Sequence, residues 1–435
     1  MTGSKCFLLL GKNVVGEINP DSSEGNDFFR YSENWKKEGF ALSPTLPLNG
    51  KIKKTDFLLF LENLLPEGRA LEHLSRLNNI SKNNVLALCL AIGNDLAGAL
   101  RLSLTDNVPD VAEQIRPITF EEIVQKLDFP DTHPIDIWDG KPRLSVAGMQ
   151  AKINVLKVEN NYALVNGERL CSTHILKFES AQKHLLLNEF LTTKLAKSLG
   201  FAVAELNLKR IGSHRVLEVT RFDRAYRNEQ VLRRPMIDAC QALGLSSSLK
   251  YEQNFGTGRD VAHIRDGASF KKLFSLTRFA TDPLRMMDNF LHWMLFNVVI
   301  GNCDAHGKNF SFFVGKDGLT PTPWYDLVSV CQIPQVQQSL AMSIGDEFEL
   351  EHLHALQILC EAQSCGLDFE DVCRALTHVL DSIDEELDRM ELSDDFDEEE
   401  KKYIVEYRSN ISARLRNWRK ELELMPKIAS DKSLF

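Results

Sequence analysis

Two acidic residues and an amide stand at a spacing that suits phosphoryl transfer. Asp304 and Asn309 lie five residues apart, and Asp326 follows in Pro323-Trp-Tyr-Asp-Leu327. In protein kinases, an Asp-x-x-x-x-Asn loop supplies a base for the attacking hydroxyl and an amide ligand for magnesium, and a second Asp holds magnesium against the phosphates. This reaction depends on positioning and charge neutralisation, so two carboxylates and one amide oxygen suffice here. The spacing alone is common, and a solvated loop is the alternative interpretation.

The residues around this loop favour the catalytic interpretation. After Asn309, apolar and polar residues alternate up to a turn at Lys316-Asp-Gly318, which predicts a hairpin that presents Asp326 beside Asp304. Before the loop, apolar residues at helical spacing predict a helix that ends where the loop begins. These residues are Leu284, Met287, Leu291, Met294, Leu295 and Val298.

A second group of candidate residues lies in the preceding, strand-rich part of the chain. The segment Ser145-Val-Ala-Gly-Met-Gln-Ala-Lys-Ile153 has one glycine where a G-x-G-x-x-G loop has three, so both a phosphate cradle and a simple hairpin turn remain open. Lys177 stands on an apolar strand; such a lysine usually extends from a sheet edge, but in a kinase it pairs with the α- and β-phosphates. Val219-Thr-Arg-Phe-Asp-Arg224 ends the last strand where a kinase has its hinge, with Phe222 near the adenine.

Composition restricts the class of protein. With 435 residues, 43% hydrophobic and 26% charged, the chain is long enough for two or three soluble domains. No apolar run reaches bilayer-spanning length, and nine scattered cysteines without a C-x-x-C pair suggest buried free thiols in a reducing cytoplasm. We therefore expect a cytoplasmic protein with no membrane partner. The net charge of −10 argues against nucleic-acid binding over the whole surface.

The expected elements give an α+β fold with the two-lobed layout of protein kinases. We expect domains at 1–108, 109–235 and 236–435. Predicted strands lie at 7–10, 14–18, 28–31, 151–156, 174–178, 205–211 and 216–221. Predicted helices lie at 57–63, 85–91 and 185–199, with a turn-rich loop at 93–99. The remainder, 235–435, is expected to be mainly helical with one hairpin near 310–325.

A series of motifs covers nearly the whole chain. The N-terminal ones are Leu42-Ser-Pro-Thr-Leu-Pro47, Asn63-Leu-Leu-Pro-Glu-Gly68 and Gly93-Asn-Asp-Leu-Ala-Gly-Ala99. The central ones are Ser145-Val-Ala-Gly-Met-Gln-Ala-Lys152, Thr173-His-Ile-Leu-Lys177, Arg221-Phe-Asp-Arg224, Cys240-Gln-Ala-Leu-Gly244 and Lys250-Tyr-Glu252. The last are Gly301-Asn-Cys-Asp-Ala-His-Gly-Lys-Asn309 and Tyr325-Asp-Leu327. In this order the series resembles the HipA family of bacterial toxin kinases, with an accessory N-terminal subdomain before the kinase lobes.

The resemblance implies a role for each candidate residue. Asp304 is the expected catalytic base, His306 lies near the phosphates, and Asn309 and Asp326 bind Mg²⁺. Ser145 matches the serine that family members autophosphorylate, which ejects the phosphate loop because a dianion beside the triphosphate repels it. The expected ATP-binding residues are Ala147, Gly148, Met149, Gln150, Lys152, Lys177, Arg221, Phe222 and Tyr325.

Three positions depart from the family pattern. Ala151 replaces an acidic residue of the phosphate loop, Thr220 stands where a glutamate often precedes Arg-Phe-Asp-Arg, and Met236 replaces a polar adenine contact. These changes bear on nucleotide affinity and base selectivity. None of them touches the acidic and amide residues of the catalytic loop.

The function implied is that of an ATP- and Mg²⁺-dependent serine/threonine protein kinase, the toxin of a type II toxin–antitoxin pair. The resemblance implies an aminoacyl-tRNA synthetase as substrate, glutamyl-tRNA synthetase being the family's best example. Its partner would be a HipB-like helix-turn-helix antitoxin, through which the chain contacts operator DNA indirectly. A non-catalytic kinase-fold corepressor is disfavoured by the retained Asp304, Asn309, Asp326 and Lys177. A small-molecule kinase is disfavoured by the N-terminal accessory region and the Ser145 loop.

Overall fold

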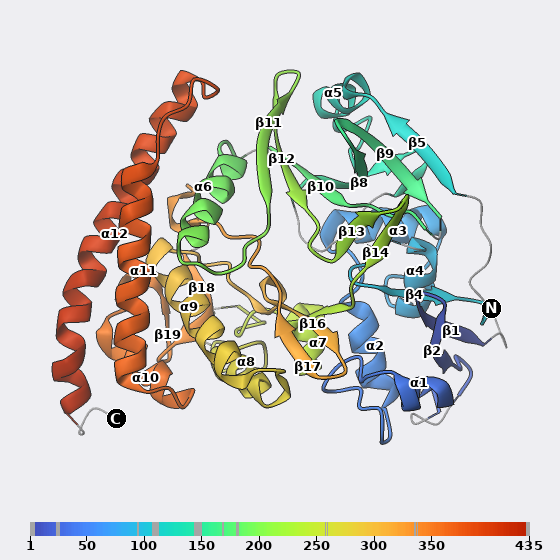
Figure 1. Ribbon diagram of the computed structural model, residues 1–435, viewed down its shortest axis with the longest axis horizontal. Coiled ribbons are helices and arrows are strands. Elements are labelled where there is room, and N and C mark those ends of the chain that lie inside the picture. The colour runs from blue at the N-terminus through green and yellow to red at the C-terminus, as the bar shows by residue number, and fades with distance from the viewer. Residues whose placement is uncertain are drawn as a thin grey trace. The chain divides into compact units, whose positions relative to one another are not determined.

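The computed structural model describes residues 5–22, 27–93, 95–106, 113–142, 150–167, 169–179, 182–256, 258, 260–334, 336 and 338–431. The chain folds into two compact units, whose elements are labelled in Figure 1. The first unit contains Met1–Ser180, Glu205–Ser247 and Ser311–Leu319. The second contains Ala181–Ala204, Ser248–Phe310 and Thr320–Phe435.

The first unit begins with a small antiparallel sheet in the order β3-β2-β1-β4. Its strands are β1 (Cys6–Leu10), β2 (Asn13–Ile18), β3 (Phe29–Tyr31) and β4 (Leu100–Ser103). The helices of this region are α1 (Glu33–Glu38), α2 (Lys54–Glu62), α3 (Gly68–Asn78) and α4 (Val85–Ile92). Phe29 of the sheet stacks on Phe57 of α2 with ring centroids 4.0 Å apart. The strands and helices predicted for this region are confirmed.

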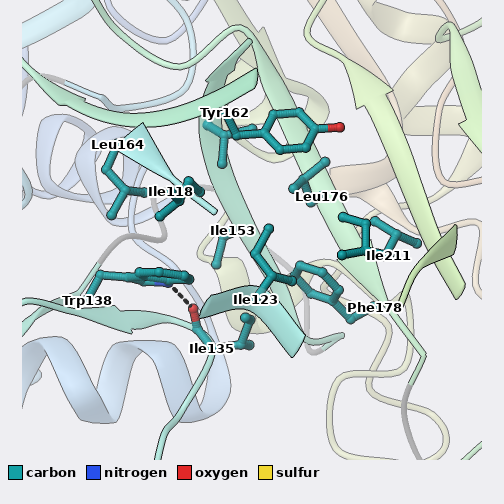
Figure 2. Packing of buried hydrophobic residues seen from close by; sticks show 12 residues of the cluster. Ile118, Ile123, Ile135, Trp138, Ile153, Tyr162, Leu164, Leu176, Phe178 and Ile211 are labelled. Carbon is teal, nitrogen blue, oxygen red and sulfur yellow. Dashed lines mark hydrogen bonds between the residues drawn. The ribbon is translucent and has the colours of Figure 1, made fainter. Parts of the chain in front are cut away.

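A larger antiparallel sheet follows, in the order β11-β12-β10-β8-β9-β5. Its strands are β5 (Gln114–Ile118), β8 (Lys152–Val158), β9 (Asn161–Asn166), β10 (His174–Phe178), β11 (Leu206–Ile211) and β12 (His214–Thr220). The short strands β6 (Ile137–Trp138) and β7 (Lys141–Pro142) pair with each other, and helix α5 (Phe120–Asp128) begins with a capping box. Figure 2 shows the core on one face of the sheet, where Ile153, Leu176 and Phe178 pack with Ile123 and Trp138. Burial of this apolar face is the main stabilising contribution to the sheet.

The remaining elements of the first unit follow β12. A hairpin is formed by β13 (Arg224–Arg227) and β14 (Gln230–Arg233), and α7 (Ala239–Leu243) follows β15 (Met236–Asp238). β15 pairs with β16 (Ser311–Gly315), and β17 (Gly318–Pro321) completes that sheet. The hairpin predicted after Asn309 is confirmed.

The second unit is mainly helical. Its helices are α6 (Leu185–Ser198), α8 (Phe270–Ser275), α9 (Pro283–Ile300), α10 (Ala355–Ser364), α11 (Phe369–Arg389) and α12 (Glu398–Ser430). Short 3-10 turns lie at Ser247–Leu249, Leu276–Phe279, Gly307–Asn309, Val330–Gln332 and Leu350–His352. The expectation of a single hairpin after residue 235 was wrong, because β18 (Ser339–Ile344) pairs with β19 (Glu347–Glu349). The predicted apolar stripe of α9 was wrong at Leu284, which is 78% exposed.

The prediction that the cysteines are buried was wrong for four of them. All nine cysteines are free, five of them buried and four partly exposed. Within the described ranges, every helix is too short or too polar to cross a bilayer.

Candidate active site

The second unit carries the predicted catalytic loop at the C-terminal end of α9. Pro283 takes the first turn of this helix, and the Asp282 side chain caps it by accepting a hydrogen bond from the Arg285 N–H. The helix ends at Gly301, whose φ is 71°. A β-carbon at this glycine would lie 2.3 Å from Cys331 Sγ. Both the left-handed backbone and the close approach therefore require glycine where the loop begins.

Residues 301–310 form a buried scaffold around one exposed carboxylate. The side chain of Asn302 accepts the Asp304 N–H at 3.1 Å and donates back to α9 at 2.8 Å. The Ala341 N–H donates to the Cys303 carbonyl at 2.8 Å, which ties the loop to β18. Within this range Asp304 alone is exposed, and every other residue is buried. A carboxylate that is open to solvent on a rigid support is suited to accept a proton from a protein substrate.

The two predicted magnesium ligands lie close to this loop. Asn309 Nδ2 donates to the Asp304 carbonyl at 2.8 Å, so its Oδ1 is the atom that could coordinate a cation. Asp326 has a φ of 57°, a left-handed conformation that is uncommon outside glycine. Its charge acts on the ring of His306, so Asp326 lies near the loop.

These residues fit magnesium only if other ligands join them. Among the residues that the structure describes, no group of three or more His, Cys, Asp or Glu side chains could hold a metal ion. Magnesium at nucleotide sites takes one or two carboxylates and completes its shell with phosphate oxygens and water. An amide oxygen from Asn309 and a carboxylate from Asp326 match that donor set.

His306 is a neutral, buried part of the loop. Burial lowers the pKa of its imidazole to about 3; the charge of Lys250 acts in the same direction and that of Asp326 opposes both. Its Nδ1 accepts the Lys308 N–H at 3.3 Å, and the Tyr325 hydroxyl donates to the Lys308 carbonyl at 2.7 Å. Only Nε2 of His306 is therefore suited to donate toward a phosphate. The catalytic role of His306 and the adenine contact of Tyr325 stay predictions.

The segment after Asp326 is anchored to two helices. Asn188 of α6 pairs in both directions with Ser329: its Oδ1 accepts the Ser329 N–H at 2.8 Å, and its Nδ2 donates to the Ser329 carbonyl at 3.1 Å. The Ser329 hydroxyl donates to the carbonyl of Ile300, at the end of α9, at 2.6 Å. Asn188 and Ser329 are fully buried, so these hydrogen bonds are strong constraints on the backbone that follows Asp326.

In the first unit, two lysines predicted to bind ATP lie on neighbouring strands. Lys177 of β10 pairs with Lys152 of β8 in the antiparallel register, so both side chains project from the same face. This face is opposite to the one that carries Leu176 and Phe178 in the core. Both lysines are buried, and two cationic side chains on one face of the sheet suit an anionic ligand. Gln150 Nε2 donates to the Phe178 carbonyl at 3.4 Å at the start of the same region.

Four of the predicted residues lie outside the described ranges. These are Ser145, Ala147, Gly148 and Met149. Their assignments to autophosphorylation and to ATP binding stay predictions.

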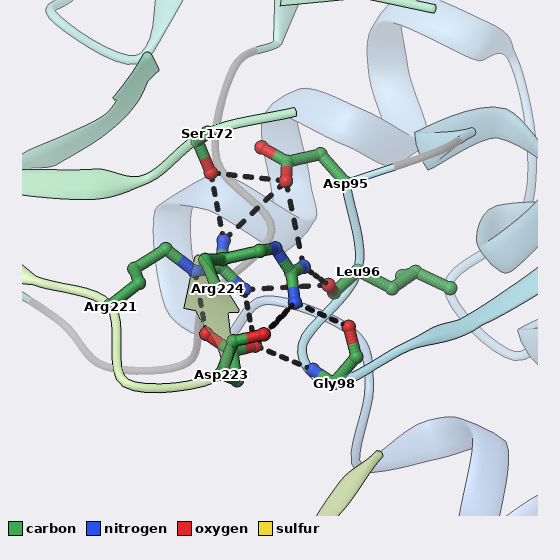
Figure 3. A network of polar contacts seen from close by, with 7 residues as sticks. All are labelled: Asp95, Leu96, Gly98, Ser172, Arg221, Asp223 and Arg224. Carbon is green, nitrogen blue, oxygen red and sulfur yellow. Dashed lines mark hydrogen bonds and ion pairs between the residues drawn. The ribbon is translucent and has the colours of Figure 1, made fainter. Parts of the chain in front are cut away.

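Arg221 lies in a buried charge network of the first unit (Figure 3). Its guanidinium donates to both carboxylate oxygens of Asp223 at 3.0 and 2.8 Å, and to the Ser172 hydroxyl at 2.9 Å. Arg224 donates to Asp223 at 2.7 Å and to the carbonyl of Gly98 at 2.6 Å. The guanidinium of Arg221 thus donates hydrogen bonds to groups within the protein. Its predicted contact with ATP stays a prediction.

Phe222 lies between these charged residues in sequence and is half-buried, and its ring contacts an aromatic residue. Its ring meets Phe313 of β16 edge-on, with centroids 6.0 Å apart. The expected position of Phe222 beside an adenine ring stays a prediction.

Sequence reasoning missed one residue at the loop. The Tyr251 hydroxyl donates to Asp304 Oδ1 at 2.7 Å, and its ring packs edge-on against His306. The motif Lys250-Tyr-Glu252 had contributed to the family resemblance without a role. A lone tyrosine far from the loop in sequence has no spacing pattern that would reveal this contact.

The chain is similar to known proteins over most of its length. The family model for the HipA-like C-terminal domain matches residues 144–387, and that for the HipA N-terminal domain matches residues 8–103. The chain is 43% identical to the serine/threonine-protein kinase toxin HipA of Shewanella oneidensis, over 93% of this chain and 94% of the relative. It is 32% identical to a putative kinase of Sinorhizobium fredii, over 87% of this chain and 89% of that relative. A solved structure of the Shewanella oneidensis HipA, HipB and operator DNA complex matches with a TM-score of 0.87 and 41% identity, covering 97% of this chain and 99% of that one.

The fold, α+β with a strand-rich N-terminal part and a helical C-terminal part, is that of a protein kinase. More narrowly, the chain belongs to the HipA family of serine/threonine-protein kinase toxins. The resemblance and the enzyme class predicted from the sequence are confirmed.

Proposed function

We propose that this chain transfers the γ-phosphate of ATP to a serine of an aminoacyl-tRNA synthetase, with glutamyl-tRNA synthetase as the first candidate. The observation that carries the proposal is Asp304, the exposed carboxylate on the otherwise buried loop 301–310. A base that acts on a folded protein substrate must reach solvent while its backbone stays fixed. Asp304 meets both conditions.

The residues of the second unit have distinct tasks in this reaction. Asp304 accepts the proton of the attacking hydroxyl, and Asn309 and Asp326 hold Mg²⁺ by their side-chain oxygens. When bound, Mg²⁺ neutralises the charge that develops on the phosphate oxygens. His306 stays neutral and is suited to donate a hydrogen bond from Nε2 to a phosphate oxygen.

The lysines of the first unit bind the nucleotide. Lys177 and Lys152 offer two positive charges on one face of the sheet, which suits the α- and β-phosphates of ATP. Both lysines are buried, which strengthens their attraction for a polyanion relative to a surface pair. We assign the hinge contact with adenine to the backbone around Phe222, with Tyr325 also lining the adenine pocket.

Regulation would use a serine and a partner protein. Autophosphorylation at Ser145 would place a dianion beside the phosphate-binding segment and so switch the kinase off. A HipB-like helix-turn-helix antitoxin would bind the chain at operator DNA, as the solved Shewanella oneidensis complex of HipA, HipB and DNA suggests. The net charge of −10 supports DNA contact mainly through that antitoxin.

Phosphate transfer with labelled ATP tests the base assignment. Asp304→Asn should lower transfer to glutamyl-tRNA synthetase by roughly 10²–10⁴-fold, the range expected for loss of a general base. Its melting temperature should not change, because an exposed carboxylate contributes little packing. Asp317→Asn, at an exposed position in the turn between β16 and β17, is the matched control and should transfer phosphate like the wild type. Full activity in the Asp304 variant would refute the assignment, and a wild type that labels neither the synthetase nor itself would refute the proposed function.

A further inference from the structure

A three-residue segment of the second unit, Lys250-Tyr-Glu252, packs against the catalytic loop. The Tyr251 hydroxyl donates to Asp304 Oδ1 at 2.7 Å. The Tyr251 ring meets the His306 ring nearly at right angles, with centroids 5.1 Å apart. The Gly307 N–H donates to the Lys250 carbonyl at 2.9 Å. Two neighbouring residues therefore contact the loop at three points.

The segment itself is held by a buried glutamate. Glu252 is only 3% exposed, and its Oε1 accepts a hydrogen bond from Arg265 Nε at 2.8 Å. Its Oε2 accepts the Ser343 N–H at 2.7 Å. A carboxylate that is buried and paired on both oxygens fixes its own backbone strongly, because releasing it would leave a charge uncompensated. Tyr251 is therefore attached to a rigid support.

A single strand residue aligns this support with the loop. The Ala341 N–H donates to the Cys303 carbonyl at 2.8 Å, and the Ala341 carbonyl accepts the Glu252 N–H at 2.9 Å. One residue of β18 thus fixes the backbone next to Asp304 and the backbone next to Tyr251. The spacing of the two backbone segments that carry Asp304 and Tyr251 is consequently set by main-chain hydrogen bonds.

We propose that Tyr251 is a positioning residue for phosphoryl transfer. Its hydroxyl holds the Asp304 carboxylate through Oδ1 in one orientation toward the hydroxyl of the substrate serine. A hydrogen bond to a carboxylate is short and strong, and it stops rotation of a side chain that is otherwise exposed. The barrier falls because the reacting geometry is already formed before the substrate arrives. The inference rests on the proposed role of Asp304 as base.

The test compares Tyr251→Phe with Asp304→Asn and with a control, Tyr226→Phe. Tyr226 lies on β13 of the first unit, 44% exposed, so its variant loses the same hydroxyl away from the loop. Each full-length protein is assayed with Mg²⁺ and labelled ATP for transfer to glutamyl-tRNA synthetase and to itself. The KM and the calorimetric Kd for ATP, and the melting temperature, are measured beside kcat.

Tyr251→Phe should lower kcat about tenfold, as expected for the loss of one hydrogen bond to a charged group. The KM and Kd for ATP and the melting temperature should stay at the wild-type values, as should every property of Tyr226→Phe. A purely structural hydroxyl would lower the melting temperature or the ATP affinity together with kcat, and that result would overturn the inference.

The outcomes separate this inference from the proposed function. An inactive Asp304→Asn variant beside an unchanged Tyr251→Phe variant would remove Tyr251 alone from the mechanism. An active Asp304→Asn variant would remove the base assignment, and the inference about Tyr251 with it.

Discussion

Replacement of Asp223 by asparagine tests the buried charge network of the first unit. The Asp223 side chain is 5% exposed and compensates two guanidinium groups, those of Arg221 and Arg224, which are 3% and 0% exposed. It also accepts the Gly98 N–H at 2.8 Å. Burial alone would raise the pKa of Asp223, but the charges of Arg221 and Arg224 outweigh it and hold the pKa well below its usual range. The carboxylate is therefore ionised at every physiological pH.

The expected cost follows from the loss of one charge. Asparagine keeps the size of the side chain but leaves two buried cations without their buried, hydrogen-bonded anion, since Asp95 is more distant and partly exposed. Removing one partner of a buried ion pair destabilises a protein by about 3–5 kcal/mol. For a unit of this size each kcal/mol corresponds to roughly 2–4 °C, so the melting temperature should fall by roughly 6–20 °C. The lost free energy is a large part of the roughly 5–15 kcal/mol by which a typical domain is stable.

Thermal unfolding followed by circular dichroism measures this effect, with Asp95→Asn as a control from the same network. Asp95 is 27% exposed and lies 3.5 and 3.8 Å from the two guanidinium groups, so its loss should cost about 1 kcal/mol. Because the pKa of Asp223 is depressed in the fold, its contribution to stability is complete above about pH 4 and is lost as the pH falls below that value. The difference in free energy of unfolding between the wild type and Asp223→Asn should therefore become smaller only in acid. A cost below about 1 kcal/mol, or an equal cost for both variants, would refute the view that Asp223 is the central anion.

Two further predictions concern other parts of the molecule. Burial lowers the pKa of His174 to about 4, so as the pH falls the unfolded chain takes up a proton before the folded chain does. The free energy of unfolding should therefore fall as the pH drops from about 6.5 to 4. His174→Gln should flatten this pH dependence, and an unchanged slope would contradict the role of His174. Asn188→Ala removes both hydrogen bonds to Ser329, so the Mg²⁺ concentration for half-maximal phosphate transfer should rise several-fold, which corresponds to a net loss of about 1 kcal/mol in metal binding. Asn410→Ala, an exposed asparagine of α12, should leave the Mg²⁺ titration unchanged, and equal titrations for both variants would contradict a link to the metal site.

Elements with a clear period could be predicted from the sequence. The strand predicted at 174–178 has these bounds in the structure, and the helix predicted at 185–199 ends one residue earlier. The hairpin β13–β14 was missed because its turn, Asn228-Glu229, lacks the glycine that marks such turns, although both residues have positive φ. Strand β18 was missed because five of its six residues are buried, so it shows no alternation of apolar and polar positions.

The candidate site shows the same limit. Asp304 and Asn309 share one short loop, and the sequence order reveals their spacing directly. Tyr251 reaches Asp304 only through tertiary structure, since β18 aligns two segments that are distant in sequence. A motif search finds the groups that react, but the groups that orient them follow from packing. The three domains proposed from the sequence, 1–108, 109–235 and 236–435, stay predictions.

The buried charge network also connects two motifs that are distant in sequence, the one that contains Gly98 and Arg221-Phe-Asp-Arg224. Arg221-Phe-Asp-Arg224 brings two cations and one anion into the core, so the second cation needs further acceptors. The carbonyls of Leu96 and Gly98 supply them, each at 2.6 Å from Arg224. The turn that presents these carbonyls needs glycine at 98, because φ is 71° and a β-carbon would lie 2.9 Å from the Met236 carbonyl. The glycine-rich loop of the N-terminal domain and the charged motif of the kinase core are therefore one structural unit. A substitution in either motif should therefore disturb the structure of the other motif more than it disturbs the catalytic loop.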